Sequence, residues 1–193
     1  MRCILCERLS LKGICKICLT KLLKQEKHTR ILENNLKVYS FFSYDTILPI
    51  LYTKHHFWGH RILKQIAKNT FGKFAKEFEF DESIYAIGID DKIDDNYSHT
   101  AILTNAIKSK NIRPIYNILR AKNSIKYSGK SYEYRRANPR NFFVHSKYKN
   151  GGFDAVLIDD IITSGQTLKE ANETLKKANI NVLFALTLAD ARD

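Results

Sequence analysis

Short apolar runs alternate with amphipathic segments along most of the chain. The runs are rich in β-branched, aliphatic and aromatic residues and are short enough for buried strands, at 38–44, 84–89, 112–119, 155–158 and 180–188. Apolar side chains at three- and four-residue steps predict helices at 47–71, with a turn near Gly59, and at 97–108 and 166–178. Residues 19–32 are basic and favour a helix or a linker, whereas 120–141 have no clear period. Strands that alternate with helices predict an α/β fold, a doubly wound parallel sheet covered on both faces.

The most informative stretch spans residues 153–169, where an apolar run is followed by two acids, a small polar loop and a helix. The acids are Asp159 and Asp160, and the loop at 163–167 carries hydroxyl groups and a glycine. A helix N-terminus presents free N–H groups and a partial positive charge, which suit a phosphate. Two carboxylates beside a phosphate would repel it unless they face sugar hydroxyls or a metal ion. These residues therefore predict a site for a phosphorylated sugar, with the phosphate on the loop and the vicinal diol on the acids.

Residues 156–167 also resemble a known signature, the phosphoribosyl-pyrophosphate (PRPP) binding motif of the type I phosphoribosyltransferases. The resemblance implies that Asp159 and Asp160 hold the ribose hydroxyls. It assigns the 5′-phosphate to the loop residues Thr163, Ser164, Gly165, Gln166 and Thr167. It also implies Mg²⁺ as a cofactor with PRPP, and it places Arg120 and Lys122 to reach the pyrophosphate. The alternative is an ordinary strand, turn and helix with an acidic cap.

All four cysteines fall within the first eighteen residues, at Cys3, Cys6, Cys15 and Cys18. Their spacing is C-x2-C-x8-C-x2-C, with Gly13 providing the turn between two knuckles. Pairs of thiolates two residues apart can reach one tetrahedral metal ion, and four thiolates close a structural Zn²⁺ site with no open position. A disulfide framework is disfavoured in a reducing compartment, and a thioredoxin-like redox pair would not need two copies. We therefore predict a zinc-binding four-cysteine knuckle and linker at 1–30, followed by a phosphoribosyltransferase-like domain at 31–193.

Positive charge is concentrated in one part of the chain, although the whole chain carries a net charge of +12. Residues 108–149 contain twelve lysines or arginines and one acid, whereas 77–95 are acidic. Basic residues interleaved with aromatic side chains can contact the phosphates and the bases of single-stranded DNA. The candidates for such contacts are Lys126, Lys130, Tyr132, Tyr134, Arg135, Arg136 and Arg140. The alternative is a hood over the active site that is basic because its ligand is anionic.

The order of these features resembles the ComF family of competence proteins, which are phosphoribosyltransferase-like and are needed for the uptake of transforming DNA. Its members carry a cysteine knuckle, an early Tyr before a Lys-containing helix start, and an Arg-rich segment ahead of the PRPP motif. Here the cysteines, Tyr44 with Lys54, and the segment 135–142 follow in that order. The chain departs from the family at 88–99, where aspartates stand in a loop that is basic in the family and helps to hold pyrophosphate. Acids there weaken pyrophosphate binding unless Mg²⁺ bridges them.

These resemblances predict a competence protein that assists the uptake of single-stranded DNA and binds PRPP with Mg²⁺. A DNA-translocating helicase is a candidate partner. The alternatives are a phosphoribosyltransferase of nucleotide salvage and a non-catalytic, PRPP-sensing binding protein. No base-recognition segment follows 180–188, so the acceptor and the catalytic residues stay open. No run reaches the eighteen or so apolar residues that span a bilayer, and the N-terminus has no signal-peptide pattern, so we expect a cytoplasmic protein.

Overall fold

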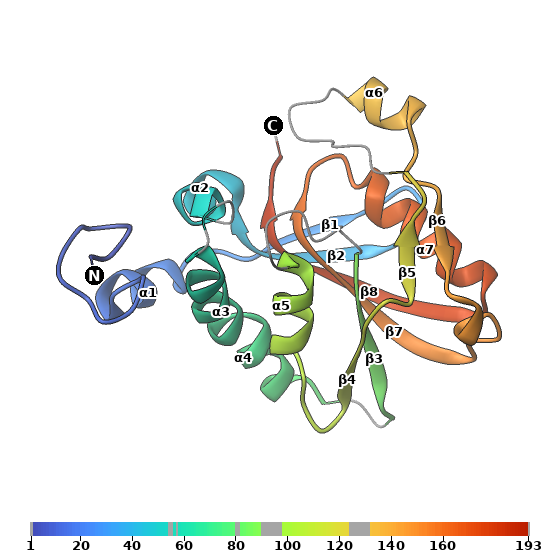
Figure 1. The fold of residues 1–193 in the computed structure, drawn as a ribbon, viewed down its shortest axis with the longest axis horizontal. Helices are drawn as coiled ribbons and strands as arrows, with labels where there is room; N and C mark the ends of the chain where they lie inside the picture. The colour runs from blue at the N-terminus through green and yellow to red at the C-terminus, as the bar shows by residue number, and fades with distance from the viewer. Residues whose placement is uncertain are drawn as a thin grey trace.

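A six-stranded, mostly parallel sheet forms the centre of the molecule (Figure 1). The computed structural model describes residues 2–53, 56, 58–79, 82–89, 98–123 and 132–192. For Tyr132, Arg135 and Arg136 it describes the backbone but not the side chain. Across the sheet the order is β1 (His28–Ile31), β2 (Lys37–Ser43), β8 (Ile180–Asp190), β7 (Phe153–Ile162), β3 (Ile84–Gly88) and β4 (Ile112–Ile115). β1 pairs antiparallel with β2, and the other strands run parallel to one another. The predicted α/β class is confirmed, with one antiparallel strand at an edge.

Helices cover both faces of the sheet, and each face has its own hydrophobic core (Figure 1). The helices on one face are α2 (Tyr44–Tyr52), α3 (Gly59–Asn69), α4 (Phe71–Glu77) and α5 (His99–Ala106). The other face is covered by α7 (Gln166–Lys177). Within β7, Val156 and Ile158 enter the first core, whereas Ala155 and Leu157 enter the second, as a strand buried on both faces requires. Among the described helices, none is long and apolar enough to cross a membrane.

The chain reverses its direction of travel across the sheet between β3 and β7. From β3 it passes through α5 to β4 on one side, then returns to β7 on the other side of β3 and continues through α7 to β8. The helices α5 and α7 consequently leave the carboxyl ends of two neighbouring strands toward opposite faces. Open α/β sheets bind ligands in the crevice that such a reversal creates. The fold therefore places a candidate ligand crevice at the carboxyl ends of β3 and β7.

The apolar run at 112–119 forms parts of two strands, so the prediction of a single strand there was wrong. Its first half is β4, which pairs with β3 in the main sheet. Its end begins β5 (Leu119–Ala121), which pairs with β6 (Phe142–Val144) in a separate two-stranded sheet. The break falls where Asn117 adopts a positive φ of 59°, a backbone conformation that Asn tolerates and that interrupts a strand. β6 follows α6 (Tyr132–Ala137), and a short 3-10 helix, η2 (Ser146–Tyr148), leads on to β7.

The basic segment 19–32 contains the end of a helix, α1 (Lys16–Leu22), and then the strand β1. The prediction of a helix or linker throughout this segment was therefore wrong. In β1 the half-buried positions are His28 and Arg30, while Ile31 is 70% exposed, which reverses the usual pattern of a surface strand. Hydrogen bonds to β2 make a hairpin whose turn includes Asn35 at a φ of 61°. A short strand with its polar side inward cannot be found from periodicity.

Candidate functional site

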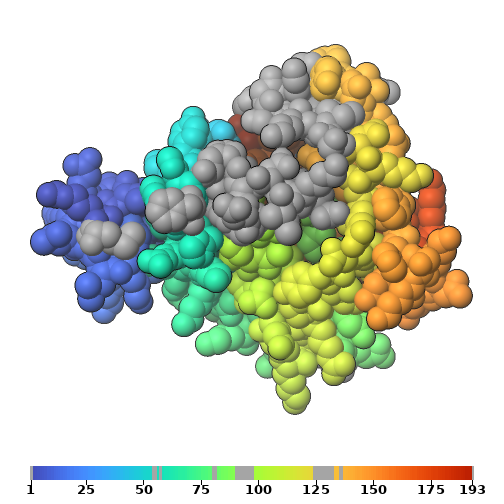
Figure 2. All heavy atoms as spheres, in the orientation of Figure 1, coloured from blue at the N-terminus to red at the C-terminus, as the bar shows by residue number. Residues whose placement is uncertain are grey.

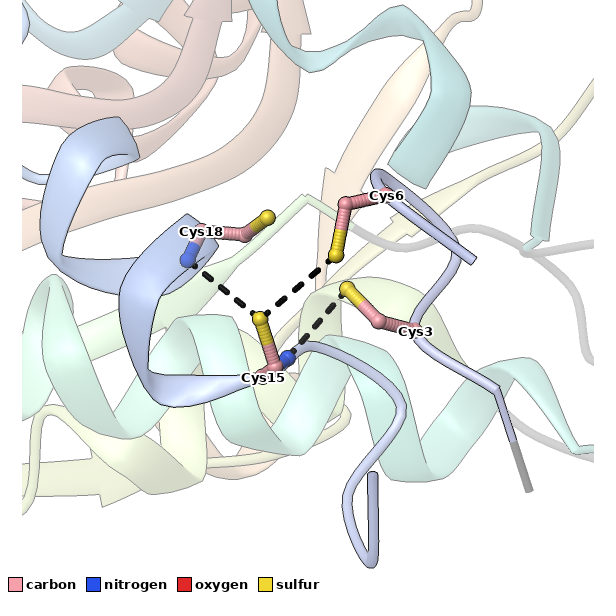
Figure 3. A group of neighbouring side chains, drawn as sticks. All are labelled: Cys3, Cys6, Cys15 and Cys18. Carbon is pink, nitrogen blue, oxygen red and sulfur yellow. Dashed lines mark hydrogen bonds between the residues drawn. The ribbon is translucent and has the colours of Figure 1, made fainter. Parts of the chain in front are cut away.

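The four cysteines gather in the N-terminal segment, which protrudes from one end of the molecule beside α2 and α3 (Figure 1, Figure 2). Their Sγ atoms all lie within 4.8 Å of one another and face a common space (Figure 3). The Sγ atoms of Cys6 and Cys15 are 3.8 Å apart. A tetrahedral Zn²⁺ with Zn–S bonds of about 2.3 Å requires sulfur separations of about 3.8 Å. The four thiols therefore fit a zinc ion.

Two different local structures present the two cysteine pairs. Cys3 and Cys6 stand on a turn in which the N–H of Glu7 donates to the carbonyl of Cys3 at 2.8 Å, and Glu7 has a positive φ of 60°. Cys15 instead caps α1, and its sulfur accepts a hydrogen bond from the N–H of Cys18 at 3.5 Å. The first pair forms a knuckle, whereas the second pair begins a helix in place of the second knuckle that the spacing predicts.

Hydrogen bonding favours the thiolate form at one position of the cluster. Burial raises the pKa of the Cys3 thiol, but hydrogen bonds from backbone N–H groups, the largest from Cys15, together outweigh burial and lower this pKa to about 6. Hydrogen bonding to Cys6, followed by burial, raises the pKa of Cys18 to about 12. Thiolates this close repel one another unless a cation lies between them. A divalent metal ion supplies that charge and lets all four sulfurs act as ligands.

The cysteine segment is fixed to the rest of the protein through Ile14 and Gln65. Ile14 is fully buried, and its backbone N–H and carbonyl both bond the side-chain amide of Gln65 in α3, at 3.1 and 2.7 Å. Gly13 permits this close approach, because a Cβ at that position would lie 2.3 Å from a carbon of the Ile62 side chain. A metal ion held by the four cysteines would therefore stabilise a surface that packs against the core on the α3 side of the sheet.

Asp159 and Asp160 lie in β7 at the point where its neighbour β3 ends. Among the described residues, the last bond between the two segments joins the N–H of Ile89 to the carbonyl of Ile158 at 2.9 Å, while β7 continues beside β8. β7 is therefore longer than the predicted run at 155–158. Asp159 is 7% exposed, and its carboxylate accepts a hydrogen bond from the N–H of Asp160 at 2.8 Å. The acidic pair therefore lies level with the end of β3, where the topology places the candidate ligand crevice.

The loop after β7 leads directly into the N-terminus of α7. Gly165 has a left-handed backbone conformation, with a φ of 77°, and precedes the first helical residue, Gln166. The N–H of Lys169 makes the first helical bond, to the carbonyl of Gly165 at 2.9 Å, so the preceding N–H groups lie outside the helical ladder. One of them, on Gln166, donates to the Ser164 hydroxyl at 3.4 Å. Residues 163–167 thus form one turn whose donors and helix dipole suit an anion.

Two residues remote in sequence hold this loop. Arg30 of β1 donates a hydrogen bond to the carbonyl of Thr163. Leu32 lies against Gly165, where an added Cβ would come within 2.6 Å of the leucine side chain. The sequence pattern predicts neither contact, because it favours a basic helix or linker for residues 19–32. The buried Asp190, which pairs with Arg30 at the end of β8, is marked in the sequence only by its place after the last apolar run.

Arg120 and Lys122 lie on or beside the two-stranded β5–β6 sheet. Arg120 is an exposed residue within β5, opposite Phe143 in register, whereas the pattern placed it in a loop at a strand end. Lys122 lines a polar cavity of about 420 Å³, together with Asn141, Glu173 and other side chains of α7 and the β6 segment. Contacts from either residue to pyrophosphate stay predictions.

The structure describes part of the predicted DNA-binding segment. Lys126, Lys130 and the acidic loop 90–97 lie outside the described residues. The helix α6 contains Tyr132, Tyr134, Arg135 and Arg136. Tyr134 is 39% exposed, and the backbone N–H of Arg140 donates to Glu170 of α7 at 3.0 Å. Figure 1 shows α6 on the side of the sheet where β7 and β8 end, a placement that fits both a hood and a DNA-binding segment.

No family model and no curated protein matches the chain. Similar solved structures include a hypoxanthine phosphoribosyltransferase from Staphylococcus aureus, at 16% identity and a TM-score of 0.39, over 66% of this chain and 62% of that one. This chain thus spans less than two thirds of that protein. An adenine phosphoribosyltransferase from Saccharomyces cerevisiae, complexed with an imino-altritol bisphosphate and adenine, is 16% identical with a TM-score of 0.41, over 91% and 89%. An orotate phosphoribosyltransferase from Aeropyrum pernix is 16% identical with a TM-score of 0.36, over 89% and 81%. TM-scores this low leave the function to be argued from the residues of this chain.

Proposed function

We propose that the protein binds PRPP in the crevice at the carboxyl ends of β3 and β7. The proposal rests on the order of groups along one piece of chain: an acidic pair in a central strand, level with the end of the neighbouring β3, the left-handed Gly165, and the N-terminus of α7. The 5′-phosphate accepts hydrogen bonds from the loop N–H groups, and the ribose diol donates to Asp159 and Asp160. The likeness of 156–167 to the PRPP motif favours this ligand over other sugar phosphates.

A transferase reaction at this site breaks the bond from the anomeric carbon of ribose to pyrophosphate and forms a bond to an acceptor. Its transition state resembles an oxocarbenium ion, so the protein contributes positioning and charge around the leaving group. Arg120 and Lys122 are the proposed cations of the leaving-group side. Mg²⁺ prefers oxygen ligands and, bound with PRPP, neutralises charge on the pyrophosphate.

We also propose that the four cysteines hold a structural Zn²⁺. Four thiolates complete a tetrahedral site and leave no position for a substrate. Within the proposed division into a knuckle and linker at 1–30 and a phosphoribosyltransferase-like domain at 31–193, the knuckle has a supporting role. This role is favoured by the buried Ile14, which ties the knuckle to α3.

We propose further that the basic segment binds single-stranded DNA and that the protein acts in the cytoplasm in competence, with a DNA-translocating helicase as a candidate partner. The charge is concentrated at 108–149. Exposed aromatic side chains accompany it, with Tyr134 at 39% and Phe143 at 38% exposed. Arg120 lies opposite Phe143, so a cation and a stacking face are neighbours on one surface.

Calorimetric titration of the zinc-loaded protein with PRPP, with and without Mg²⁺, tests the main proposal. A parallel assay measures pyrophosphate release. We expect PRPP binding that strengthens with Mg²⁺. Absence of binding in both conditions would mean that 156–167 is a structural strand, turn and helix only.

The same experiment separates the alternatives. Turnover of PRPP with a free nucleobase would favour a phosphoribosyltransferase of nucleotide salvage. Binding without pyrophosphate release would favour a PRPP-sensing protein that is not a catalyst. An anisotropy titration with a labelled single strand, with and without PRPP, then shows whether PRPP controls DNA binding.

A further inference from the structure

The antiparallel hairpin of β1 and β2 contacts the loop at 163–167 and the first turn of α7 at three points. Arg30 donates to the carbonyl of Thr163, and Leu32 packs against Gly165. The next residue in the hairpin turn, Glu33, forms an ion pair with Lys169 in the first turn of α7, at 2.6 Å. The hairpin therefore contacts the chain before Gly165, at Gly165 and after Gly165. Of these contacts, the ion pair is exposed and contributes least.

Arg30 is itself held in one orientation by a buried carboxylate. Its Nε donates to Asp190 at 3.1 Å, and its Nη2 pairs with the other oxygen of the same carboxylate. The side chain of Asp190 is 2% exposed, and that of Arg30 is 19% exposed. Paired donors on one carboxylate fix the plane of the guanidinium. The remaining Nη1 group is thereby directed at the Thr163 carbonyl.

Asp190 stands level with the start of the loop. It lies opposite Ile162 in the β7–β8 register, and the N–H of Ala191 donates to the carbonyl of Ile162 at 2.8 Å. A second arginine, Arg192, donates to the same carboxylate at 2.9 Å and to the carbonyl of Thr29 at 2.6 Å. The carboxylate thus joins the end of β8, the edge strand β1 and the loop into one network.

The contact to Thr163 sets the direction of the next peptide N–H. In a trans peptide the carbonyl and the following N–H point in opposite directions. A carbonyl bonded to Arg30 therefore turns the N–H of Ser164 away from the guanidinium. Among the described residues, none accepts a hydrogen bond from this N–H. It is a donor available to an anion.

We propose that Arg30 is a positioning residue for the phosphate of the sugar-phosphate ligand, acting through the peptide between Thr163 and Ser164. This inference rests on the proposed function of the loop. Because Arg30 is fixed by Asp190 and bonded to the Thr163 carbonyl, we assign its action to geometry: Arg30 holds the N–H group of Ser164 in place before the phosphate arrives.

Binding of ribose 5-phosphate to Arg30→Gln, Arg30→Lys and Arg192→Gln tests the proposal. Arg192→Gln is the matched control, because it removes a partner of the same carboxylate without touching Thr163. We expect Arg30→Gln to weaken binding about tenfold and Arg192→Gln to leave it within about twofold. Arg30→Lys keeps the charge but cannot serve both partners in one plane, so we expect it to resemble Arg30→Gln. Equal effects of Arg30→Gln and Arg192→Gln, or full restoration by lysine, would overturn the proposal.

The amide resonance of Ser164 in the ligand-free proteins gives a second readout that does not depend on the ligand. We expect it to shift in both Arg30 variants and to stay in place in Arg192→Gln. An unmoved Ser164 resonance in the Arg30 variants would contradict the positioning role even if affinity fell. If wild-type protein fails to bind ribose 5-phosphate or PRPP, the proposed function fails. The Ser164 resonance still decides whether Arg30 orients the peptide.

Discussion

The cysteine cluster and the loop at 163–167, with the residues that support it, are built in opposite ways. All four sulfurs of the cluster come from residues 3–18, and they face one another within 4.8 Å. The loop at 163–167 is also one short stretch, but the side chains that hold it come from distant parts of the fold. Arg30 is 133 positions from Thr163 and 160 positions from Asp190. A local site can fold around its own ligand, whereas an assembled site needs the whole sheet to be in place first.

The two sites also select opposite charges. Thiolates close together favour a cation, and four of them can complete the coordination of a zinc ion. The loop at the start of α7 has N–H groups outside the helical ladder, which suit an anion, and among the described residues none accepts a hydrogen bond from the N–H of Ser164. On the proposed functions, the first site stabilises the fold, whereas the second must release and rebind its ligand.

Removing the metal should have the largest effect. We expect Cys6→Ser, or chelation of the zinc, to lower the free energy of unfolding by at least about 3 kcal/mol, because metal binding here is coupled to folding. Urea unfolding followed by circular dichroism, with zinc content measured in parallel, checks this. Leu11→Ala is the control, since that side chain is 100% exposed in the same segment. An unchanged urea midpoint in zinc-free Cys6→Ser would contradict the structural role.

The acidic pair should matter for ligand and not for fold. We expect Asp159→Asn with Asp160→Asn to weaken PRPP binding at least about 100-fold, because two charged acceptors of the diol are lost. Affinity for single-stranded DNA should not change. Asp154→Asn is the control, since Asp154 lies near the other end of β7 and bonds Asn181 at 2.8 Å. Joint loss of PRPP and DNA binding would contradict the separation of the two surfaces.

Two glycines with positive φ separate the effect of the Leu32–Gly165 contact on stability from the effect of backbone strain alone. A Cβ at Gly152, with a φ of 72°, meets nothing closer than 3.6 Å, so Gly152→Ala should cost about 1–2 kcal/mol of stability. Gly165→Ala adds a clash with Leu32 and should cost more. Thermal unfolding measures both. Adding Leu32→Ala to Gly165→Ala should recover the excess, and failure to recover it would contradict the packing of the hairpin on the loop.

The smallest expected effect is a change in proton release on zinc binding. The pKa of Cys3 is about 6, so this thiol is already ionised at neutral pH and releases a proton to zinc only below that value. The pKa of Cys18 is about 12, so it releases a proton throughout the acidic and neutral range. Zinc binding should therefore release about one more proton at pH 5 than at pH 7.5, with affinity falling more steeply below pH 6. Calorimetry in buffers of different ionisation enthalpy measures this, and equal release at both pH values would contradict it.

What the sequence predicts depends on whether the signal is local. The four cysteines, the run from Val156 to Thr167 and the helix α7 each carry their pattern within a few residues, and the structure presents each as one unit. The α/β class follows from the alternation of such units. Local spacing therefore predicts both candidate sites, although it does not predict that Cys15 and Cys18 begin a helix.

Features that depend on tertiary contacts are not predicted. β1 is stabilised by pairing with β2, and its half-buried positions are His28 and Arg30, of which Arg30 pairs with the distant Asp190. Likewise, the apolar run at 112–119 contains no pattern that shows where Asn117 will turn the chain toward β6. In each case the partner that determines the local structure is distant in sequence, so the periodicity of the segment itself does not reveal it.

A crystal structure of the zinc-loaded protein with PRPP and Mg²⁺ tests the central claim most directly. The account predicts the 5′-phosphate against the N–H groups of 163–167 and the ribose hydroxyls on Asp159 and Asp160, with Arg30 still bonded to the Thr163 carbonyl. PRPP bound elsewhere, such as in the polar cavity beside Lys122, with the 163–167 loop free of phosphate, would contradict it.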